Sequence, residues 1–372
     1  MASPDNPTIC RVKQYRQEAG LSQAQLAELA GVKRQAIYDI ESNRYLPNTG
    51  VALRLARHLG CLVEDLFSEG QEMEEQVLIL EERGPAACSR VSLARVRGRL
   101  IGYPLDGEYA LNHELRAADG ITTPGTGRVR LLHTDPVMEN TVLLMGCDPA
   151  FSLLAAHVSR KDPKARILCR FASSQASLDA LAAGQTHLAG THFHSSPGED
   201  SNVLAAREKL SGAGGMVVGF SMMEEGFMVA RGNPLGIRSA GDLASKGVRL
   251  VNREEGAALR VLLDDELSGK GIPTSAVAGY DHIVRSHSQG AQMVACNVAD
   301  AALGLAPIAH AFGLDFVPIV EVRCDLVIPA DIKEHPAIRC MLDAIQSRNL
   351  REEISLLRGY HPGQTGNIIA QF

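Results

Sequence analysis

Residues 21–46 carry the pattern that most restricts the fold of this chain: two short amphipathic stretches separated by a tight turn. Ser22 is a natural N-cap for a helix starting at Gln23, because its hydroxyl can accept hydrogen bonds from the free amides of the first turn. Gly31 can adopt the positive φ needed to leave that helix. The next helix opens with Lys33, Arg34 and Gln35. This geometry lets one helix brace on a DNA backbone while the next enters the major groove.

Apolar residues at helical spacing predict the core of this N-terminal module. Leu26 and Leu29 are expected on the inner face of the first motif helix, and Ile37 and Ile40 on that of the second. Asn43 is expected to close the second helix. A further amphipathic helix is expected to follow, with its apolar positions at Ala52, Leu55, Ala56 and Leu59.

The composition favours a chain of several packed domains. Its 372 residues are 45% hydrophobic, enough for two or three domains. Only 4% are aromatic and Trp is absent, so the cores must be built from aliphatic residues, which suits helices packed on parallel strands. The net charge is -6, but residues 1–68 carry eight Lys or Arg and seven Asp or Glu. Residues 69–82 carry six acids and no base, so the acid excess lies outside the predicted DNA-binding module.

The eight Cys are scattered without a C-x-x-C pair. Apolar runs are short everywhere, and none reaches the roughly 18 residues of a membrane span. We therefore expect neither a signal peptide nor a membrane segment, and a cytoplasmic protein with reduced thiols.

Several short pieces of the N-terminal module follow one pattern: Arg16, Gly20–Gln23, Leu26–Ala27, Gly31–Val32, Arg34–Gln35, Ile37, Ile40–Glu41, Leu53–Ala56 and Glu64–Phe67. Together they make residues 9–67 resemble the Cro/repressor-type (XRE) helix-turn-helix family. The resemblance implies that Gln23 contacts phosphate and that Asn43 and Arg44 lie near the backbone. It also implies that bases are read by Lys33, Arg34, Gln35, Tyr38 and Asp39. Arg34 suits guanine and Gln35 suits adenine, while the alternative is an ordinary solvated helix face.

A change of pattern follows the N-terminal module. Gly70–Glu75 is predicted to be an acidic linker. Short apolar runs bounded by Gly, Pro and Asp are typical of strands joined by turns, and we expect three to five strands in a small β-rich segment. These runs lie at 77–80, 91–96, 100–103 and 129–132. Such a segment couples domains, forms a dimer contact or serves as a spacer.

The C-terminal half alternates strands with helices, which predicts parallel sheets with ligand sites off the carboxyl ends of the strands. The first set of expected strands lies at 141–146, 166–171 and 188–192, with helices at 150–158 and 176–183. The strand ends carry Cys147, Asp148, Ser173, Ser174, Thr191 and His192. A second set is expected at 227–230, 248–253, 299–304 and 316–319. Two α/β lobes with a cleft between them are the expected result.

A second group of matching pieces lies in this half: Gly146–Pro149, Ser177–Gly184, His187–His192, Gly232–Gly236, Asp242–Leu243, Val251–Arg253, Leu262–Asp264, Gly279–Tyr280, Ala299–Asp300, Leu314–Phe316, Asp325–Val327 and Gly359–Tyr360. Residues 141–361 therefore resemble the PBP-like ligand domain, related to type 2 periplasmic binding proteins of the molybdate/tungstate kind. The family often has Gly-Ser-Gly-Thr-Arg where residues 256–260 read Gly-Ala-Ala-Leu-Arg. Two hydroxyls are missing there.

The expected organisation is thus multidomain. An all-α helix-turn-helix domain occupies 1–68, a linker with the β-rich segment 69–140, and a two-lobed α/β PBP-like domain 141–372.

Oxyanions are held by backbone amides, hydroxyls and Arg. The candidate ligand contacts are Cys147, Asp148, Ser173, Ser174, Thr191, His192, Asn252 and Arg253. Asp148 opposes a bare anion and is expected to cap a helix or to meet a donor on the ligand. The alternative for the Ser and Asn residues is a turn or cap role. His187, His192 and His194 lack a neighbouring Cys or carboxylate set with metal-ligand spacing, so neither a metal nor a cofactor is predicted.

These patterns favour a one-component transcriptional regulator. It would bind operator DNA as a homodimer and sense a small molecule, for example an oxyanion such as molybdate or tungstate. The alternative is an enzyme or accessory protein of molybdenum-cofactor or anion metabolism with a DNA-binding appendage. The sequence holds no P-loop and no nucleophile elbow, so catalysis is not predicted. A chromosome- or partner-binding protein with a vestigial ligand lobe is the third reading.

Overall fold

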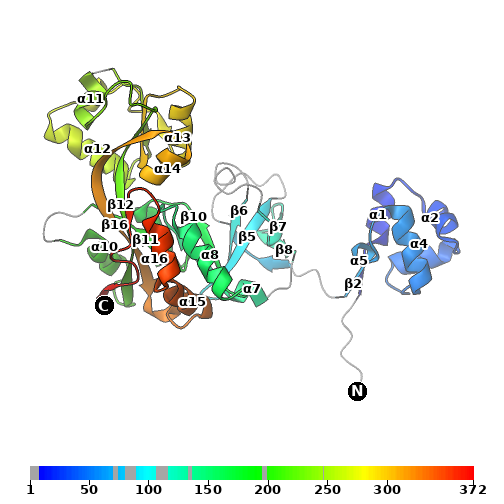
Figure 1. Cartoon of the computed structure of the whole chain (residues 1–372). Coiled ribbons are helices and arrows are strands. Elements are labelled where there is room, and N and C mark those ends of the chain that lie inside the picture. The colour runs from blue at the N-terminus through cyan, green and yellow to red at the C-terminus, as the bar shows by residue number, and fades with distance from the viewer. Residues whose placement is uncertain are drawn as a thin grey trace. The chain divides into compact units, whose positions relative to one another are not determined.

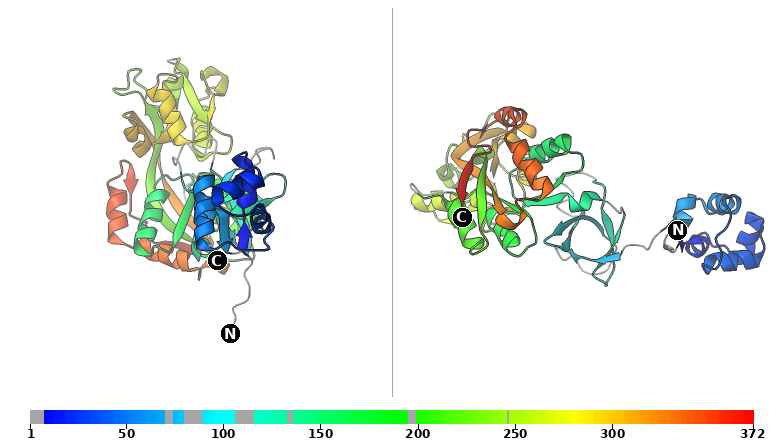
Figure 2. Two further views of the ribbon diagram at one scale, coloured as in Figure 1. Left: turned by 90° about the vertical axis from the view of Figure 1, so that its right-hand side faces the viewer. Right: turned by 90° about the horizontal axis from the view of Figure 1, so that it is seen from below.

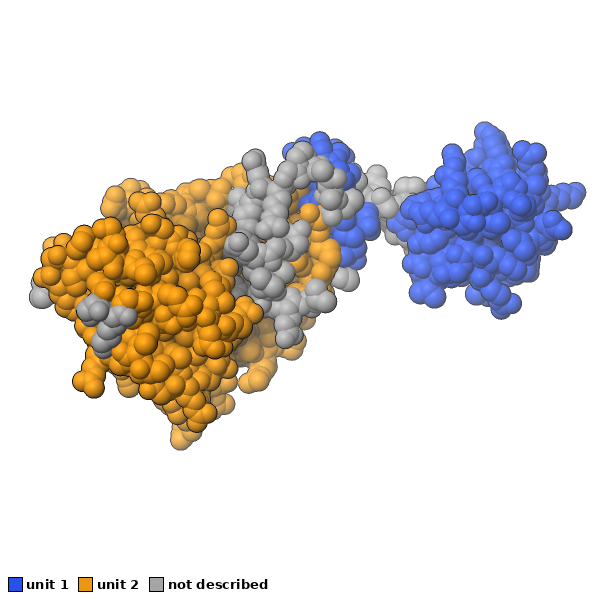
Figure 3. Space-filling view, turned by 90° about the horizontal axis from the view of Figure 1, so that it is seen from above, with its two compact units in different colours: residues 1–76, 86–88, 119–134 blue, residues 77–85, 89–118, 135–372 orange. Residues whose placement is uncertain are grey.

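The computed structural model describes residues 8–69, 74–79, 89–105, 116–132, 136–194, 199–245 and 247–372. They belong to two compact units, coloured separately in Figure 3. The first unit comprises 1–76, 86–88 and 119–134, and the second 77–85, 89–118 and 135–372. Gly70 to Met73 of the predicted linker and Leu80 of the first predicted strand lie outside the described residues.

The N-terminal helices confirm the predicted motif (Figure 1). In chain order the elements are β1 (Thr8–Cys10), α1 (Val12–Glu18), α2 (Gln23–Ala30), α3 (Arg34–Glu41), α4 (Thr49–Leu59), α5 (Val63–Leu66) and β2 (Phe67–Glu69), and β1 pairs with β2 antiparallel. Ser22 caps α2 through a reciprocal pair of hydrogen bonds with Gln25. Gly31 ends α2 with a φ of 65°, and Asn43 follows α3 with a φ of 57°.

The core of this module differs from the prediction at one position. Leu26 and Ile37 are fully buried, as expected, but Leu29 is 43% exposed. The prediction for Leu29 was wrong because the buried stripe of α2 runs through Leu26, Ala27 and Ala30. Leu29 lies outside that stripe, although it is three residues from Leu26.

The β-rich segment contains six strands among its described residues, more than the three to five expected. In the first unit, β3 (Glu74–Gln76), β8 (Arg128–Leu131) and β7 (Gly120–Thr123) pair antiparallel in that order. In the second unit, β5 (Arg90–Val96) and β6 (Arg99–Pro104) form a hairpin, and β4 (Leu78–Ile79) pairs parallel with β6. The four predicted runs are strands, whereas β3 and β7 were missed. These two strands are short and polar, so they lack the apolar alternation on which the prediction relied.

The rest of the second unit is the predicted α/β domain. Its first lobe contains α7 (Pro136–Glu139), β9 (Thr141–Met145), α8 (Phe151–Lys161), β10 (Arg166–Arg170), α9 (Ser174–Ala182), β11 (Leu188–Thr191), α10 (Ser201–Lys209), η2 (Ala330–Ile332), α15 (Pro336–Ile345), α16 (Arg348–Ser355), β17 (Tyr360–His361) and β18 (Ile368–Gln371). Its second lobe contains α11 (Ala240–Ser245), β13 (Leu250–Arg253), α12 (Ala258–Gly269), η1 (Thr274–Ala276), β14 (Ile283–Val284), α13 (His287–Ala295), β15 (Ala301–Leu305) and α14 (Ala306–Ala311).

Two long strands, β12 (Gly215–Val229) and β16 (Asp315–Pro329), run through both lobes and pair antiparallel (Figure 1). The sheet order is β10-β9-β11-β16-β12-β15-β13-β14, with β17 and β18 also pairing with β12. The predicted strands at 227–230 and 316–319 are therefore parts of longer strands. The left view of Figure 2 shows the second lobe, in yellow, above the first.

Each lobe buries a separate core on both faces of the sheet. In the first lobe, Phe151 and Leu154 of α8 pack with Met341 of α15. In the second lobe, Leu259 and Leu263 of α12 pack on the strands. A register shift interrupts the β12–β16 ladder at Glu225 and Gly226, where the lobes meet. A side chain at position 226 would collide with the Val317 carbonyl oxygen, so only Gly allows the two strands to come this close.

The β5–β6 hairpin docks on the first lobe through a buried histidine. His187 Nδ1 accepts a hydrogen bond from the Leu143 amide at 3.0 Å, and Nε2 donates to the Arg95 carbonyl oxygen at 3.1 Å. Both ring nitrogens are therefore used only when the imidazole is neutral. Burial is the largest cause that lowers the pKa of His187, to about 4.

This histidine makes the fold sensitive to acid. The folded-state pKa of about 4 lies below the unfolded value of 6.5, so the unfolded chain binds more protons between these pH values. The stabilisation is complete above about pH 6.5 and declines as the pH falls towards 4. Between pH 7.5 and 4.5, we predict that the unfolding free energy of His187→Gln falls by about 2.5 kcal/mol less than that of the wild type. Urea unfolding of the full chain at both pH values measures this. The control His282→Gln changes an exposed histidine, and an equal pH dependence in all three proteins would contradict the prediction.

Candidate functional site

The predicted DNA-reading residues share one accessible surface on and after α3. Lys33, Arg34 and Gln35 are exposed, as is Tyr38 at 42%. Gln35 Nε2 donates to Asp39 Oδ1 at 3.1 Å. After the helix, Asn43 and Arg44 are exposed too, and the Arg44 guanidinium lies 5.5 Å from the centre of the Tyr38 ring. The structure thus brings these residues together at the face that the helix-turn-helix geometry presents, and their contacts with DNA stay a prediction.

A buried ion pair holds α1 against α3, the DNA-reading helix of the motif. Arg16 of α1 donates to Glu41 of α3, with Nε 2.6 Å from Oε1, and both side chains are almost inaccessible. Gln23 donates from Nε2 to Glu41 Oε2 at 2.9 Å. The side-chain amide of Gln23, which was predicted to contact phosphate, is therefore part of this network. Glu41 holds three helices together through its two carboxylate oxygens.

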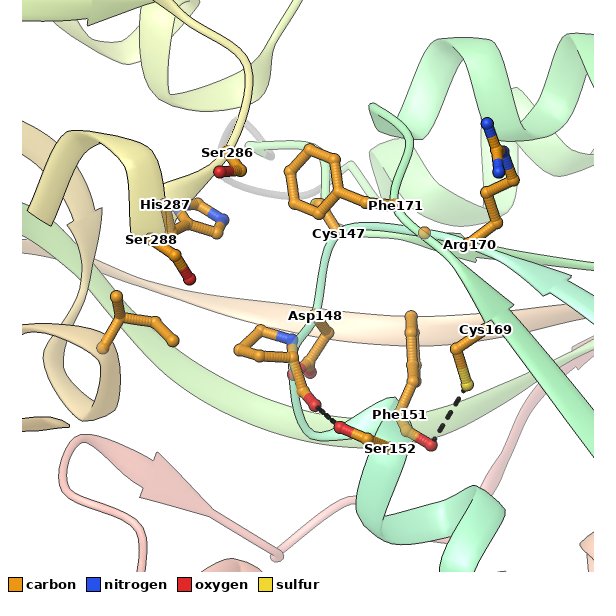
Figure 4. Close-up of a pocket in the computed structure, with 13 residues that line it drawn as sticks. Cys147, Asp148, Phe151, Ser152, Cys169, Arg170, Phe171, Ser286, His287 and Ser288 are labelled. Carbon is orange, nitrogen blue, oxygen red and sulfur yellow. Dashed lines mark hydrogen bonds between the residues drawn. The ribbon is translucent and has the colours of Figure 1, made fainter. Parts of the chain in front are cut away.

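The second unit has a cavity of about 140 Å³ between its two lobes (Figure 4). One wall is the loop after β9 with the start of α8, the second is the end of β10, and the third is the start of α13 with Ile308 of α14. The lining residues are Gly146, Cys147, Asp148, Pro149, Phe151, Ser152, Cys169, Arg170, Phe171, Ser286, His287, Ser288 and Ile308. Small residues at 146 and 190 are required here, because a side chain at either would collide with the Phe151 ring.

Next to the loop after β9, the side chains of Cys147, His192 and Glu225 form a buried row. Cys147 Sγ lies 3.2 Å from His192 Nδ1, and His192 Nε2 lies 3.2 Å from Glu225 Oε1, outside hydrogen-bonding geometry. The other carboxylate oxygen, Oε2, is 2.8 Å from His194 Nε2. Ser174 Oγ accepts the His192 amide hydrogen at 3.0 Å and so positions the histidine backbone. The row joins the first-lobe strand ends to the register shift in β12.

The row carries opposite charges in spite of its burial. Burial lowers the pKa of His192, but Cys147 and Glu225 act against it and raise that pKa well above the ordinary value. Burial likewise raises the pKa of Glu225, but His192 and His194 outweigh it and lower that pKa to about 2. His192 is therefore an imidazolium and Glu225 a carboxylate at neutral pH.

Asp148 lines the cavity, yet its oxygens are occupied by the protein. Oδ1 accepts from the Ala150 amide at 2.8 Å and from the Tyr360 hydroxyl at 2.7 Å, and Oδ2 accepts from the Ser221 hydroxyl at 2.8 Å. Burial raises the pKa of Asp148 although these hydrogen bonds lower it. The bond to Ala150 is an Asx turn just before α8, whose N-cap is Ala150 without a side-chain cap, so Asp148 does not cap the helix as considered.

The other predicted ligand contacts lie around the cavity without lining it. Ser173 caps α9 by accepting from the Ala176 amide. Asn252 uses its side chain on the Tyr280 carbonyl oxygen and the Arg253 amide. Thr191 is buried, and its hydroxyl has no hydrogen-bond partner among the described residues. The cap alternative is confirmed for Ser173, whereas Asn252 lies within β13 and its side chain ties that strand to the segment at Tyr280.

Arg253 is buried behind the second-lobe wall. Its guanidinium pairs with Glu254 at 2.9 Å and contacts His287 Nδ1 at 3.3 Å. The Arg253 charge also lies 5.4 Å from the centre of the Phe171 ring. Burial first, and then the Arg253 charge, lower the pKa of His287 well below its ordinary value. Arg253 therefore supports the wall residue His287, which is neutral.

Sequence reasoning missed several residues of this site. Arg170 and Phe171 end a predicted strand. The rule that ligands bind at the carboxyl ends of strands points to both, but it was not applied to them. Ser286 and His287 follow a two-residue strand that was not predicted. Glu225 lies in an otherwise apolar strand. An acidic residue at such a position is the only local sequence signal that points to Glu225 as a functional residue.

The described residues contain neither a membrane-spanning helix nor a cluster of metal ligands. None of their helices is long and apolar enough to cross a membrane. Within the same ranges, no group of three or more His, Cys, Asp or Glu side chains is arranged to hold a metal ion.

Comparison with known proteins accounts for both modules. The PBP superfamily domain matches residues 155–346, and the helix-turn-helix family matches residues 12–66. The chain belongs to the PBP superfamily. Its N-terminal module is a helix-turn-helix domain of the kind found in transcriptional regulators, as the 40% identity below also shows.

Two relatives cover different parts of the chain. An HTH-type transcriptional regulator of Methanothermobacter thermautotrophicus is 40% identical over 73 residues, which are 20% of this chain and 91% of the relative. The protein YvgK of Bacillus subtilis is 27% identical over 237 residues, 64% of this chain and 76% of YvgK.

Among solved structures, an ABC-type phosphate transport receptor from Vibrio cholerae is similar with a TM-score of 0.40 and 13% identity. The similarity covers 59% of this chain and 99% of the receptor. At this level it says nothing about the ligand.

The hydrogen bonds of Asp148 lead to a prediction about stability. Asp148→Ala leaves the Ala150 amide and the Ser221 and Tyr360 hydroxyls without their acceptor in a buried place. We expect the free energy of unfolding to fall by about 3 kcal/mol or more, because each unpaired buried donor costs about 1–3 kcal/mol. Urea unfolding of the full chain measures it. Asp281→Ala removes an exposed carboxylate and is expected to change stability by less than about 0.5 kcal/mol. Equal losses in the two variants would disprove the role of Asp148.

Proposed function

We propose that this protein is a ligand-responsive one-component transcriptional regulator. The observation that carries the proposal is the cavity between two lobes of a PBP superfamily domain, in the same chain as a helix-turn-helix domain. The cavity walls come from both lobes, so a bound ligand changes the balance between open and closed arrangements. A regulator of this kind acts in the cytoplasm, where the chromosome lies.

We propose that two chains bind one operator as a homodimer. A single helix-turn-helix domain reads few base pairs, and paired domains reach two half-sites about one helical turn apart. In each domain, Lys33, Arg34 and Gln35 supply the base-reading face, and Arg44 faces the phosphate backbone. The Arg16–Glu41 pair keeps this face in one orientation relative to α1, and the Gln23–Glu41 hydrogen bond does so relative to α2.

We propose a small oxyanion, such as molybdate or tungstate, as the ligand class to test first. The first turns of α8 and α13 lie in the cavity walls, so the positive ends of two helix dipoles are available there. Ser288 adds a hydroxyl. The volume of about 140 Å³ is below the roughly 300–1,000 Å³ of pockets that hold drug-sized molecules, which favours a small ligand.

The DNA-reading face yields a prediction that needs no ligand. Operator DNA is first obtained by selecting bound duplexes from a randomised pool with the full chain. We expect Arg34→Ala to weaken binding of the selected duplex about 10-fold or more, because a bidentate contact with guanine is worth about 1–3 kcal/mol. Gel-shift titration at fixed salt measures the affinity. Arg348→Ala, on α16 with a 91% exposed side chain, is the control. Unchanged affinity of Arg34→Ala would contradict the proposed reading face.

The cavity yields a separate prediction. Thermal unfolding is followed with molybdate, tungstate, sulfate or phosphate, and we expect one of them at 100 times its Kd to raise the Tm by about 5 °C or more. Ser288→Trp, which fills the cavity, is expected to abolish the shift and leave operator binding without ligand intact. A shift that persists in Ser288→Trp places the ligand elsewhere. If none of the four anions raises the Tm, the oxyanion class is wrong, and a screen of small organic acids then tests the cavity itself.

A further inference from the structure

Two cysteines line the cavity, and their surroundings differ (Figure 4). The Cys169 thiol donates to the Phe151 carbonyl oxygen at 3.4 Å, and burial raises its pKa to about 12. Cys169 is therefore an inert, protonated thiol at neutral pH. Cys147 instead has its sulfur 3.2 Å from His192 Nδ1 and 3.5 Å from His192 Nε2. Only Cys147 of these two has a base within hydrogen-bonding reach.

His192 is held in place by groups on both sides. Glu225 Oε1 lies 3.2 Å from Nε2, and Ser174 Oγ lies 3.3 Å from Nδ1. A nucleophile beside a base that a third group orients is the arrangement of activated thiols and hydroxyls. Glu225 has an exposed fraction of zero, so solvent does not screen its charge.

The titratable and charged groups around His192 and its immediate neighbours come from several elements. They are Cys147 and Asp148 in the loop after β9, His194 after β11, Glu225 on β12, Arg253 on β13, His287 on α13 and Cys324 on β16. His287 is neutral because burial and Arg253 lower its pKa, and Arg253 is paired with Glu254. Burial raises the pKa of Cys324 well above its ordinary value, so that thiol stays protonated.

We propose that Cys147, His192 and Glu225 form a reactive thiol site, in which Cys147 is modified by small electrophiles that enter the cavity. The Cys147 proton passes to His192, and the imidazolium that forms lies close to both the sulfur and the Glu225 carboxylate. The site goes beyond the proposed regulator and does not depend on its ligand or its operator.

With a hydroperoxide as the electrophile, the step balances as follows. The Cys147 sulfur attacks the terminal peroxide oxygen, so an S–O bond forms and the O–O bond breaks. The leaving alkoxide takes the proton held on His192 and departs as an alcohol. The sulfur is oxidised by two electrons to a sulfenic acid, and the peroxide is reduced by the same two electrons.

The position of the site links modification to the lobes. Glu225 is the residue at which the β12–β16 ladder shifts register, and Cys147 lines the space between the lobes. An oxygen or alkyl group on the sulfur occupies the cavity and removes the negative partner of His192. Modification therefore changes both the volume and the charge of the place where the lobes close.

Iodoacetamide alkylation of the full-length protein tests the proposal, with peptide mass spectrometry to measure the rate at each cysteine. Cys296, an exposed thiol in the same chain, is the internal standard. Between pH 6 and 8 we expect the Cys147 rate to change less than about threefold, while an ordinary thiol accelerates roughly 80-fold. Because the rate of each cysteine at pH 8 is divided by its own rate at pH 6, differences between the cysteines in access to the reagent cancel. A Cys147 rate that rises in parallel with that of Cys296 would overturn the proposal.

Two variants with one matched control then test the roles of His192 and Glu225. In His192→Gln and Glu225→Gln we expect the Cys147 rate at pH 6 to fall at least about 10-fold and its pH profile to become that of Cys296. Glu224→Gln changes the neighbouring acid of β12, whose side chain points to the opposite face of the sheet. Its Cys147 rate and pH profile are expected to match wild type. Equal effects of Glu224→Gln and Glu225→Gln refute the role of Glu225. Circular dichroism confirms folding, and if a variant does not fold, the wild-type pH profile decides alone.

Discussion

The antiparallel ladder between β12 and β16 is the interaction on which the ligand domain depends. Each strand has 15 residues, and the two are the only strands among the described residues that run through both lobes. Backbone hydrogen bonds between β12 and β16 connect the two lobes in one sheet, while each lobe has its own hydrophobic core. The ladder shifts register twice, at Gly219/Ser221 within the first lobe and at Glu225/Gly226 where the lobes meet.

A buried charge sits at this same point. Removing the Glu225 carboxylate from water is costly, and the imidazolium of His192 with the neighbouring His194 compensates that cost. Ionisable groups with strongly shifted pKa values cluster at functional sites, which supports a functional role for the row that ends at Cys147.

Local patterns predicted much of the fold, since they depend on neighbouring residues. Ser22 and Gly31 marked the ends of α2 because capping and positive φ are properties of single positions. The strands near Cys147 and His192 were found because their apolar runs are bounded by turns. Leu29 was misplaced because spacing by three does not decide which stripe of a short helix is buried. The strands β3 and β7 were missed, and β12 and β16 were only partly recognised, because their lengths are set by pairing with distant strands.

The sequence by itself determined that the chain joins a helix-turn-helix domain to a two-lobed α/β domain, and it named Cys147 and His192 as neighbours of a cleft. Only the tertiary structure decided that these two lie 3.2 Å apart, and that the Glu225 carboxylate lies 3.2 Å from the same imidazole. The physical reason is that strand ends distant in sequence meet at one edge of a sheet. Whether a polar side chain there caps a turn, as Ser173 does, or joins a charged row depends on atoms that no local pattern specifies.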